Sequence, residues 1–300
     1  MTAAGSPAVT GVGRPIVGGR RLSFNWIGVV PFFAYVALFL LFPTAIIAGG
    51  AFLNGDGSFT LSNFGNLSRS YVVSASINSL SLSAVTAVVG AVFGALLAYA
   101  ISVGNPNGLL RRIVVSASGV LAQFGGVTLA FAFLASIGPA GIVYLLAKDH
   151  GLDFYGNGFW IYDLRGLQLV YLYFQIPLMV LVFLPAVDGI KPQWREAAES
   201  LGGSTWHYWR YVAGPLLAPG FLGCTLLLFA NSFSAYATAN ALINQGGLIL
   251  PQQIANAISS EVGLHEPGFA KAIAMEMVVI VVLVTVLYSL LQRRTSRWLQ

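Results

Sequence analysis

The chain contains 300 residues, of which 57% are hydrophobic and 8% are charged. Because soluble globular domains carry about 25% charged residues, this composition excludes a soluble protein and indicates one that crosses a membrane several times. The formal net charge is +5, but the basic residues stand at the ends of apolar runs. They form no soluble basic face, which excludes nucleic acid as a partner and relates the charge to membrane topology.

Residues 1–24 are rich in Gly, Ala, Pro and Thr and carry three arginines, Arg14, Arg20 and Arg21. This composition is typical of a flexible cytoplasmic tail. We do not expect a cleaved signal peptide, because the first apolar run follows the tail and is too long for one. The sequence therefore predicts a tail at 1–24 and a membrane domain at 25–300.

Six apolar runs reach the length of about 20 residues that a helix needs to cross a bilayer. They are 26–53, 77–103, 113–137, 167–187, 216–242 and 269–291. The second run holds Gly90 and Gly94 in a spacing that lets two helices pack closely. The predicted fold class is all-α, a polytopic membrane protein with six transmembrane helices.

The orientation follows from the Lys and Arg residues beside the spans, which are more frequent on the cytoplasmic side. With a cytoplasmic N-terminus, the inner set is Arg14, Arg20, Arg21, Arg111, Arg112, Lys191, Arg195, Arg210, Arg293, Arg294 and Arg297. The outer set is smaller: Arg69, Lys148, Arg165 and Lys271. This asymmetry predicts that both termini and the loop between the fourth and fifth spans lie in the cytoplasm.

The outer loops are 54–71, 138–165 and 243–267. Within the second, 142–146 is long enough for a short interfacial helix, and Tyr155, Trp160 and Tyr162 are typical interface anchors. These loops can dock an external partner or simply connect spans, and the residues favour neither interpretation.

The cytoplasmic interval 191–219 is the longest polar stretch that still looks helical. Pro192 suits the first turn of a helix, where its missing N–H is not needed, and the Gly202-Gly203 pair ends that helix. Ser204 is placed to cap a second short helix. We expect Gly214-Pro215 to break the chain again before the fifth span.

A family resemblance rests on this interval. The residues that carry it are Glu196, Ala197, Ala198, Gly202, Val212 and Pro215. Their order and spacing are similar to the EAA loop of permease subunits of binding-protein-dependent ABC importers, with Gly214 where the family pattern has Leu. The alternative is an ordinary amphipathic helix at the interface between two spans.

The resemblance covers about 77–293 and implies a type I importer permease whose loop is a coupling helix seated in a cleft of an ATPase subunit. The coupling residues that it implies are Glu196, Ala197, Ala198, Glu199, Gly202 and Pro215. The implied partners are two cytoplasmic ATPase subunits, a second, homologous permease and an extracytoplasmic substrate-binding protein. The implied location is the bacterial cytoplasmic (inner) membrane.

The stretches LLLFANSFSAYATANALI, QQIANAI and PGFAKAIAM resemble the polyamine, iron and phosphonate branch of these permeases. The sugar branch usually has Gly-Gly-Pro after the fifth span, whereas Gly246-Gly247 is followed here by Leu248. The resemblance therefore implies a small polar or charged solute such as a polyamine, with a sugar as the alternative.

No catalytic or cofactor site is predicted. Lys148, Lys191 and Lys271 stand outside any phosphate-binding Gly-x-x-x-x-Gly-Lys-Ser/Thr pattern, so ATP and Mg would be bound by a partner ATPase subunit. The three histidines, His150, His207 and His265, are isolated, and Cys224 is the only cysteine. We expect a transport subunit that is not itself an enzyme.

Polar residues within the spans are candidates for a substrate pathway, because burying them in lipid is costly. They are Gln123, Gln175, Asn231, Ser234, Tyr236, Thr238 and Glu276. Glu276 either pairs with Lys271 or faces a water-filled cavity that attracts a cation. Hydrogen bonds between helices explain the Ser and Thr residues equally well.

Two other classes remain. An ion-coupled secondary transporter would usually show more ionisable residues within its spans and an internal repeat, and the sequence has one clear intramembrane acid and no obvious repeat. A membrane-embedded enzyme would need a convergent set of catalytic groups. The importer is the preferred hypothesis.

Overall fold

The computed structural model describes residues 25–54, 57–105, 107–156, 158–243, 247–259 and 267–296. These residues are mostly helical, and an isolated β-bridge joins Leu53 to Phe59. Within them, six helical segments are long and apolar enough to cross a membrane. The predicted all-α fold with six transmembrane helices is therefore confirmed, while the predicted tail at 1–24 lies outside the described residues.

The chain divides into two compact units, Met1–Ile46 and Ile47–Gln300. In the first unit, α1 (Asn25–Val36) is followed by a π-helical turn, η1 (Ala37–Leu41), and by the start of α2 (Phe42–Gly50). The candidate first span is Val29–Gly50, slightly shorter than predicted.

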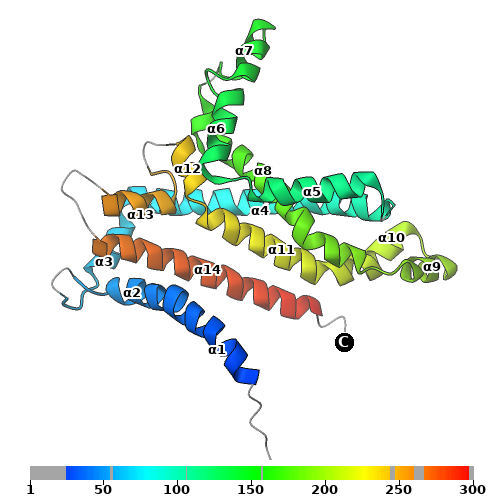
Figure 1. Ribbon diagram of the computed structural model, residues 1–300, viewed down its shortest axis with the longest axis horizontal. Helices are drawn as coiled ribbons and strands as arrows, with labels where there is room; N and C mark the ends of the chain where they lie inside the picture. Colours follow the sequence, from blue (N-terminus) through cyan, green and yellow to red (C-terminus); the bar gives the residue numbers. More distant parts are fainter. Residues whose placement is uncertain are drawn as a thin grey trace, which may run out of the picture. The chain divides into compact units, whose positions relative to one another are not determined.

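Three helices of the second unit pack side by side (Figure 1): α4 (Ser70–Val103), α8 (Leu164–Asp188) and α11 (Gly214–Ser234). Small residues make the close contact between α4 and α8 possible. A Cβ atom added at Gly94 would lie 2.4 Å from Met179 Cβ, and one at Gly90 would lie 3.0 Å from Gln175 Cβ. The close packing predicted from the Gly90 and Gly94 spacing is confirmed.

Two predicted spans are each interrupted by a break. The run 113–137 forms α5 (Leu109–Gln123) and α6 (Gly126–Ile137), and Gly126 has a φ of +70° that a side chain rarely permits. The run 216–242 forms α11 and α12 (Ala237–Leu242), which are separated at Ala235 and Tyr236. The prediction of continuous helices was wrong at both places, because hydropathy stays high across each break.

The chain continues as a helix through Gly214-Pro215, where a break was predicted. After α10 (Thr205–Tyr208), a π-helical turn, η4 (Trp209–Ala213), leads directly into α11. Proline clashes with the carbonyl four residues back and lacks an N–H, and a wider π turn relieves both problems. Gly214 also makes room, since a Cβ there would lie 2.5 Å from the carbonyl oxygen of Trp209. In the first unit, η1 likewise ends two residues before Pro43.

The remaining elements lie between the spans or beside α4. The connection between the first and second spans contains α3 (Ser62–Gly65) and η2 (Asn66–Ser68). The third candidate span is Gly126–Asp149, which includes α6 and α7 (Ile142–Asp149), so the predicted bounds 113–137 lie too early in the chain. The connection to the fourth span contains η3 (Trp160–Tyr162). The short helix predicted at 142–146 is thus present. Tyr155, which was expected as an interface anchor, is instead buried with 7% exposure. The last two helices are α13 (Leu250–Ser259) and α14 (Pro267–Ser296), which pack together (Figure 1).

Candidate functional site

The loop between the fourth and fifth spans is two short helices joined at a glycine pair, as predicted. The first is α9 (Pro192–Ser200), with Pro192 in its first turn. Gly202 adopts a φ of +78°, and its N–H and that of Gly203 bond to the carbonyls of Glu199 and Ala198 at 2.9 Å. Ser204 caps α10, since its hydroxyl accepts a hydrogen bond from the His207 backbone N–H.

Large apolar side chains of this loop are exposed. Leu201 is 89% exposed, Trp206 68% and Trp194 36%. Glu196 and Ala197 are exposed on α9 between them. Exposed apolar residues gathered beside a polar helix are typical of a surface that binds another protein. We call Trp194, Glu196, Ala197, Leu201 and Trp206 the loop surface.

The two acidic residues of α9 differ in their surroundings. Glu199 Oε1 accepts a hydrogen bond from Arg195 Nε at 2.9 Å, one helical turn away. Glu196 forms no ion pair with any residue that the structure describes. Glu196 is therefore the better placed of the two to meet a basic group of a partner. Pro215 lies off this surface, in the first turn of α11, where it shapes the π turn.

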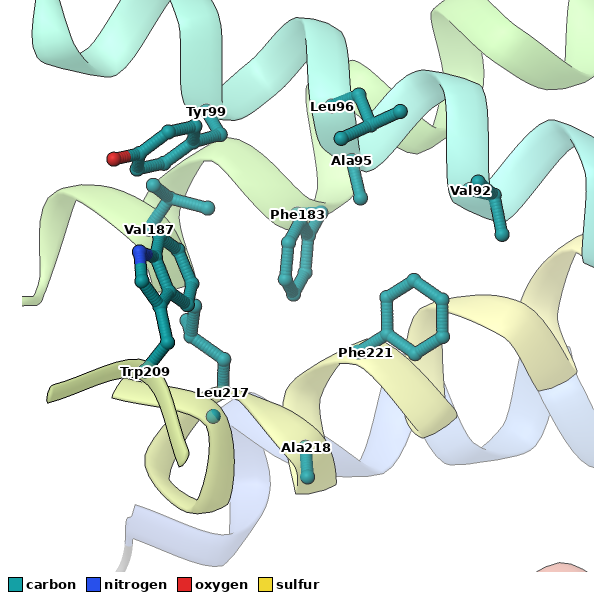
Figure 2. A pocket seen from close by; sticks show the side chains of 11 residues that line it. Val92, Ala95, Leu96, Tyr99, Phe183, Val187, Trp209, Leu217, Ala218 and Phe221 are labelled. Carbon is teal, nitrogen blue, oxygen red and sulfur yellow. The ribbon is translucent and has the colours of Figure 1, made fainter. Parts of the chain in front are cut away.

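The second half of the loop is anchored to the spans by aromatic packing. The Trp209 ring of η4 meets the Tyr99 ring of α4 edge-on, with centroids 5.0 Å apart. Beside this contact lies an apolar cavity of about 600 Å³ between α4, α8 and α11, into which Phe183 and Phe221 project (Figure 2). No charged side chain lines this cavity, so it offers no charged group to a polar solute.

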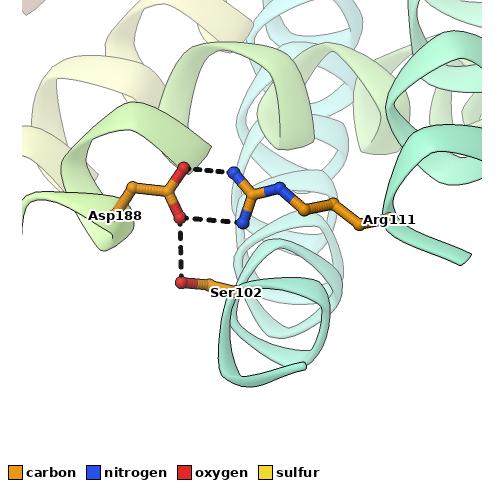
Figure 3. A network of polar contacts seen from close by, with 3 residues as sticks. All are labelled: Ser102, Arg111 and Asp188. Carbon is orange, nitrogen blue, oxygen red and sulfur yellow. Dashed lines mark hydrogen bonds and ion pairs between the residues drawn. The ribbon is translucent and has the colours of Figure 1, made fainter. Parts of the chain in front are cut away.

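The first half of the loop is anchored by a polar cluster at the end of α8 (Figure 3). Asp188 Oδ1 accepts hydrogen bonds from Arg111 Nη1 at 3.1 Å and from Ser102 Oγ at 3.0 Å, and Arg111 Nη2 donates to Asp188 Oδ2. We call these three residues the clamp. The sequence does not reveal this clamp, because it indicates only a topological charge at Arg111 and gives no signal for Asp188.

The predicted pathway residues fall into two groups. Gln175 is fully buried, donates from Nε2 to the Leu228 carbonyl at 2.7 Å and accepts from Asn231 Nδ2 at 3.4 Å. Thr238 is 3% exposed, and its hydroxyl accepts a hydrogen bond from the Gly126 N–H at 2.9 Å. These two side chains hold helices together, which the alternative interpretation anticipated for Thr238 but not for Gln175.

The second group is exposed at the two helix breaks. Gln123 is the last residue of α5, while Ser234 and Tyr236 flank the break between α11 and α12. These three residues and Asn231 are all exposed. The bond from Gly126 to Thr238 brings the two breaks together. Because interrupted helices and exposed polar groups are tolerated in a membrane only beside protein or water, this face is the candidate pathway surface.

Glu276 lies elsewhere, between α14 and α4. Its Oε1 accepts a hydrogen bond from Ser76 Oγ at 2.7 Å, and its buried Oε2 has no partner in the described part of the chain. The suggested ion pair with Lys271 is not formed between these described residues. Lys271 lies instead against Gly50, where an added Cβ would be 2.8 Å from Lys271 Nζ.

Comparisons with curated proteins identify relatives among transport permeases. The chain is 23% identical over 274 residues to the spermidine/putrescine permease PotB of Haemophilus influenzae, covering 88% of this chain and 93% of PotB. It is 25% identical to the trehalose permease SugB of Mycobacterium tuberculosis over 84% of each chain. It is 30% identical to the thiamine permease ThiP of Escherichia coli over 112 residues, which are 37% of this chain but only 20% of ThiP.

Solved structures share the fold. The structure of a bacterial ABC transporter that imports the acidic polysaccharide alginate has a chain that matches with a TM-score of 0.72 at 17% identity, over 90% of this chain and 95% of that one. Residues 90–297, which include α5, the loop surface and both breaks, match the family described as binding-protein-dependent transport system inner membrane component. This match spans more than half of the sequence, and the chain therefore belongs to that family of ABC-importer permeases.

Proposed function

We propose that this permease subunit forms half of the translocation pathway of an ATP-driven importer and is coupled to a separate ATPase through the loop surface. The observation that carries the proposal is an exposed helix, α9, with Glu196 unpaired among the described residues and Leu201 89% exposed beside it. An apolar side chain as exposed as that of Leu201 favours a partner protein at this position. A helix ended by a left-handed glycine is compact enough to act as a rigid contact.

The partners follow from the same proposal. The sequence contains no phosphate-binding loop, so ATP and Mg are bound by two cytoplasmic ATPase subunits and not by this chain. A second, homologous permease covers the candidate pathway surface. An extracytoplasmic binding protein delivers the substrate. In support, a structure of the bacterial alginate ABC transporter contains a periplasmic protein bound to an alginate pentasaccharide. Both termini lie in the cytoplasm, as the distribution of Lys and Arg favours.

The substrate that we favour is a small polar or charged solute such as a polyamine. PotB, a polyamine permease, matches over 93% of its length, and the exposed residues at the breaks are amides, a hydroxyl and a phenol that can form hydrogen bonds. A sugar is the alternative, because the trehalose permease SugB matches over a similar length. An ion-coupled secondary transporter is disfavoured by the family to which the chain belongs.

The proposal is tested by purifying the tagged chain from membranes in mild detergent and identifying what accompanies it. We expect an ATPase subunit and a second permease. The substitution Ala197→Glu, which places a charge on the loop surface, should release the ATPase but retain the second permease. Gln193→Ala, a small change on the same helix, is the matched control. A chain that purifies alone, or an Ala197→Glu complex that keeps its ATPase, would contradict the proposal.

A further inference from the structure

Three helices meet at the clamp. Asp188 is the last residue of α8, Arg111 is in the first turn of α5, and Ser102 is in the last turn of α4. Figure 3 shows the three side chains converging on the Asp188 carboxylate. The clamp therefore joins ends of spans that lie far apart in the sequence.

The clamp fixes the relative positions of three helix ends more than it contributes to the free energy of unfolding. The Arg111 and Asp188 side chains are 21% and 36% exposed, and ion pairs near the surface contribute only about 0–1 kcal/mol. However, a guanidinium that donates two hydrogen bonds to one carboxylate fixes both distance and direction. The other ion pair of the described residues, Arg195 with Glu199, joins two residues of a single helix and can do no such positioning.

The clamp lies where the loop between the fourth and fifth spans begins. Only Gly189, Ile190 and Lys191 separate Asp188 from the first residue of α9. A displacement of α9 is therefore transmitted to the clamp through a very short connection. From Asp188 it can pass to α8 directly and to α5 through Arg111.

The helix α5 runs from the clamp to the candidate pathway surface. Arg111 is near its first residue and Gln123 is its last, which is about 18 Å of helix at about 1.5 Å per residue. The helix contains no proline and packs along α8 (Figure 1). It ends at the break that the Gly126 N–H joins to Thr238. Rigid helices of this kind carry coupling between distant sites.

We infer that Arg111 is a positioning residue for coupling. With Asp188 and Ser102, it holds α5 to the end of α8, where the loop begins. When the ATPase displaces α9, the break at Gln123 therefore moves as well. This inference rests on the proposed function, because it requires the loop surface to be the ATPase contact. It adds the route by which that contact reaches the pathway.

The experiment measures the accessibility of the break in the complete complex. The substitutions Cys224→Ser and Gln123→Cys leave one cysteine in this chain, and its rate of labelling by a maleimide is measured in membrane vesicles with and without MgATP and vanadate. With the clamp intact, nucleotide should change the labelling rate about fivefold or more, the lower range of typical allosteric couplings. Arg111→Ala should abolish this dependence while the ATPase still copurifies.

Three further variants distinguish a loss of positioning by Arg111 from a loss of folding. Arg112→Ala, at the next residue, removes an arginine that has no ion pair with a described residue and should keep the nucleotide dependence. Exchange of the two charges, Arg111→Asp with Asp188→Arg, should restore it. Should Arg111→Ala fail to reach the membrane, Arg111→Lys keeps the charge but loses the paired hydrogen bonds and should weaken the dependence.

The outcomes are distinct. Unchanged nucleotide dependence in Arg111→Ala or Arg111→Lys overturns the inference. A complex that contains its ATPase but shows no nucleotide dependence at Gln123→Cys also overturns it, while leaving the proposed function intact. Absence of an ATPase from the purified complex contradicts the proposed function itself.

Discussion

The backbone N–H of Gly126 donates to Thr238 Oγ1 at 2.9 Å, and this bond joins the breaks of two membrane helices. Gly126 is the first residue of α6, and Thr238 lies in the first turn of α12. This partly buried hydrogen bond positions the exposed polar residues on both sides of it.

The variant Thr238→Val keeps the shape of the side chain but removes the acceptor for the Gly126 N–H. An unsatisfied buried donor costs about 1–3 kcal/mol, and the Gly126 N–H is partly buried, so we expect a lower midpoint of thermal unfolding in detergent with a loss near the lower end of this range. Thr238→Ser retains the hydroxyl and serves as the control. Equal midpoints for Thr238→Val and the wild type would show that the bond does not join the breaks.

The variant Gly94→Leu is expected to disturb the packing of α4 on α8, because even a Cβ would lie 2.4 Å from Met179 Cβ. Overpacking of this kind typically costs about 1–3 kcal/mol, and more where backbone must move. Thermal unfolding of the purified protein measures the effect. Gly119→Ala is the matched control, since nothing lies within 4 Å of a Cβ there. Equal loss in both variants would contradict the role assigned to Gly94.

The variant Gly202→Trp should separate ATP hydrolysis from transport while the protein remains in the membrane. The space around Gly202 is open, so the obstacle is its φ of +78°, which a bulky residue adopts at a cost of about 1–2 kcal/mol. The ATPase activity and the transport activity of the reconstituted complex are compared. Gly202→Asn, which tolerates the left-handed conformation better, should remain coupled. Normal transport in Gly202→Trp would count against the loop as the coupling element.

The turn at Asp153, between the third and fourth candidate spans, should respond to pH only under acidic conditions. The Tyr155 backbone N–H and the Tyr144 hydroxyl donate to its carboxylate at 2.9 and 3.0 Å, which lowers the pKa of Asp153 below the usual 3.8. A carboxyl with a lowered pKa stabilises the fold above its usual pKa, and this contribution is lost as the pH falls through the lowered value. Trp160 fluorescence should therefore stay constant from neutral pH down to the usual carboxyl pKa and change below it.

In Asp153→Asn the same fluorescence transition should be absent, because the amide does not titrate. Asp163→Asn, at a residue in the same connection between spans, is the matched control and should keep the transition. A transition that persists in Asp153→Asn would assign it to another group.

Local signals predicted the two short helices α9 and α10 and the glycine turn between them well, because caps and glycine turns depend on neighbours in sequence. Pro192, Gly202 and Ser204 all take the positions that their residue types favour. Likewise, the presence of six spans follows from hydropathy, although the third and fifth candidate spans, Gly126–Asp149 and Thr205–Ser234, begin and end at other residues than predicted. In these parts of the chain, local sequence and tertiary structure agree.

Features that depend on distant residues were not predictable. The break at Gly126 needs an acceptor 112 residues away, and Arg111 meets Asp188 across 77 residues. The helix through Pro215 depends on a π turn that no residue type specifies. Whether a polar residue such as Gln175 holds helices together or faces a pathway depends on its burial, which packing decides.

The measurement that tests the central claim most directly is a cross-link from the loop surface. A photoreactive amino acid replaces Ala197 in the otherwise native complex, and illumination of intact membranes is followed by mass spectrometry of the products. The account predicts a cross-link to a subunit that contains a phosphate-binding loop. Cross-links to lipid alone, or to an extracytoplasmic protein, would contradict it.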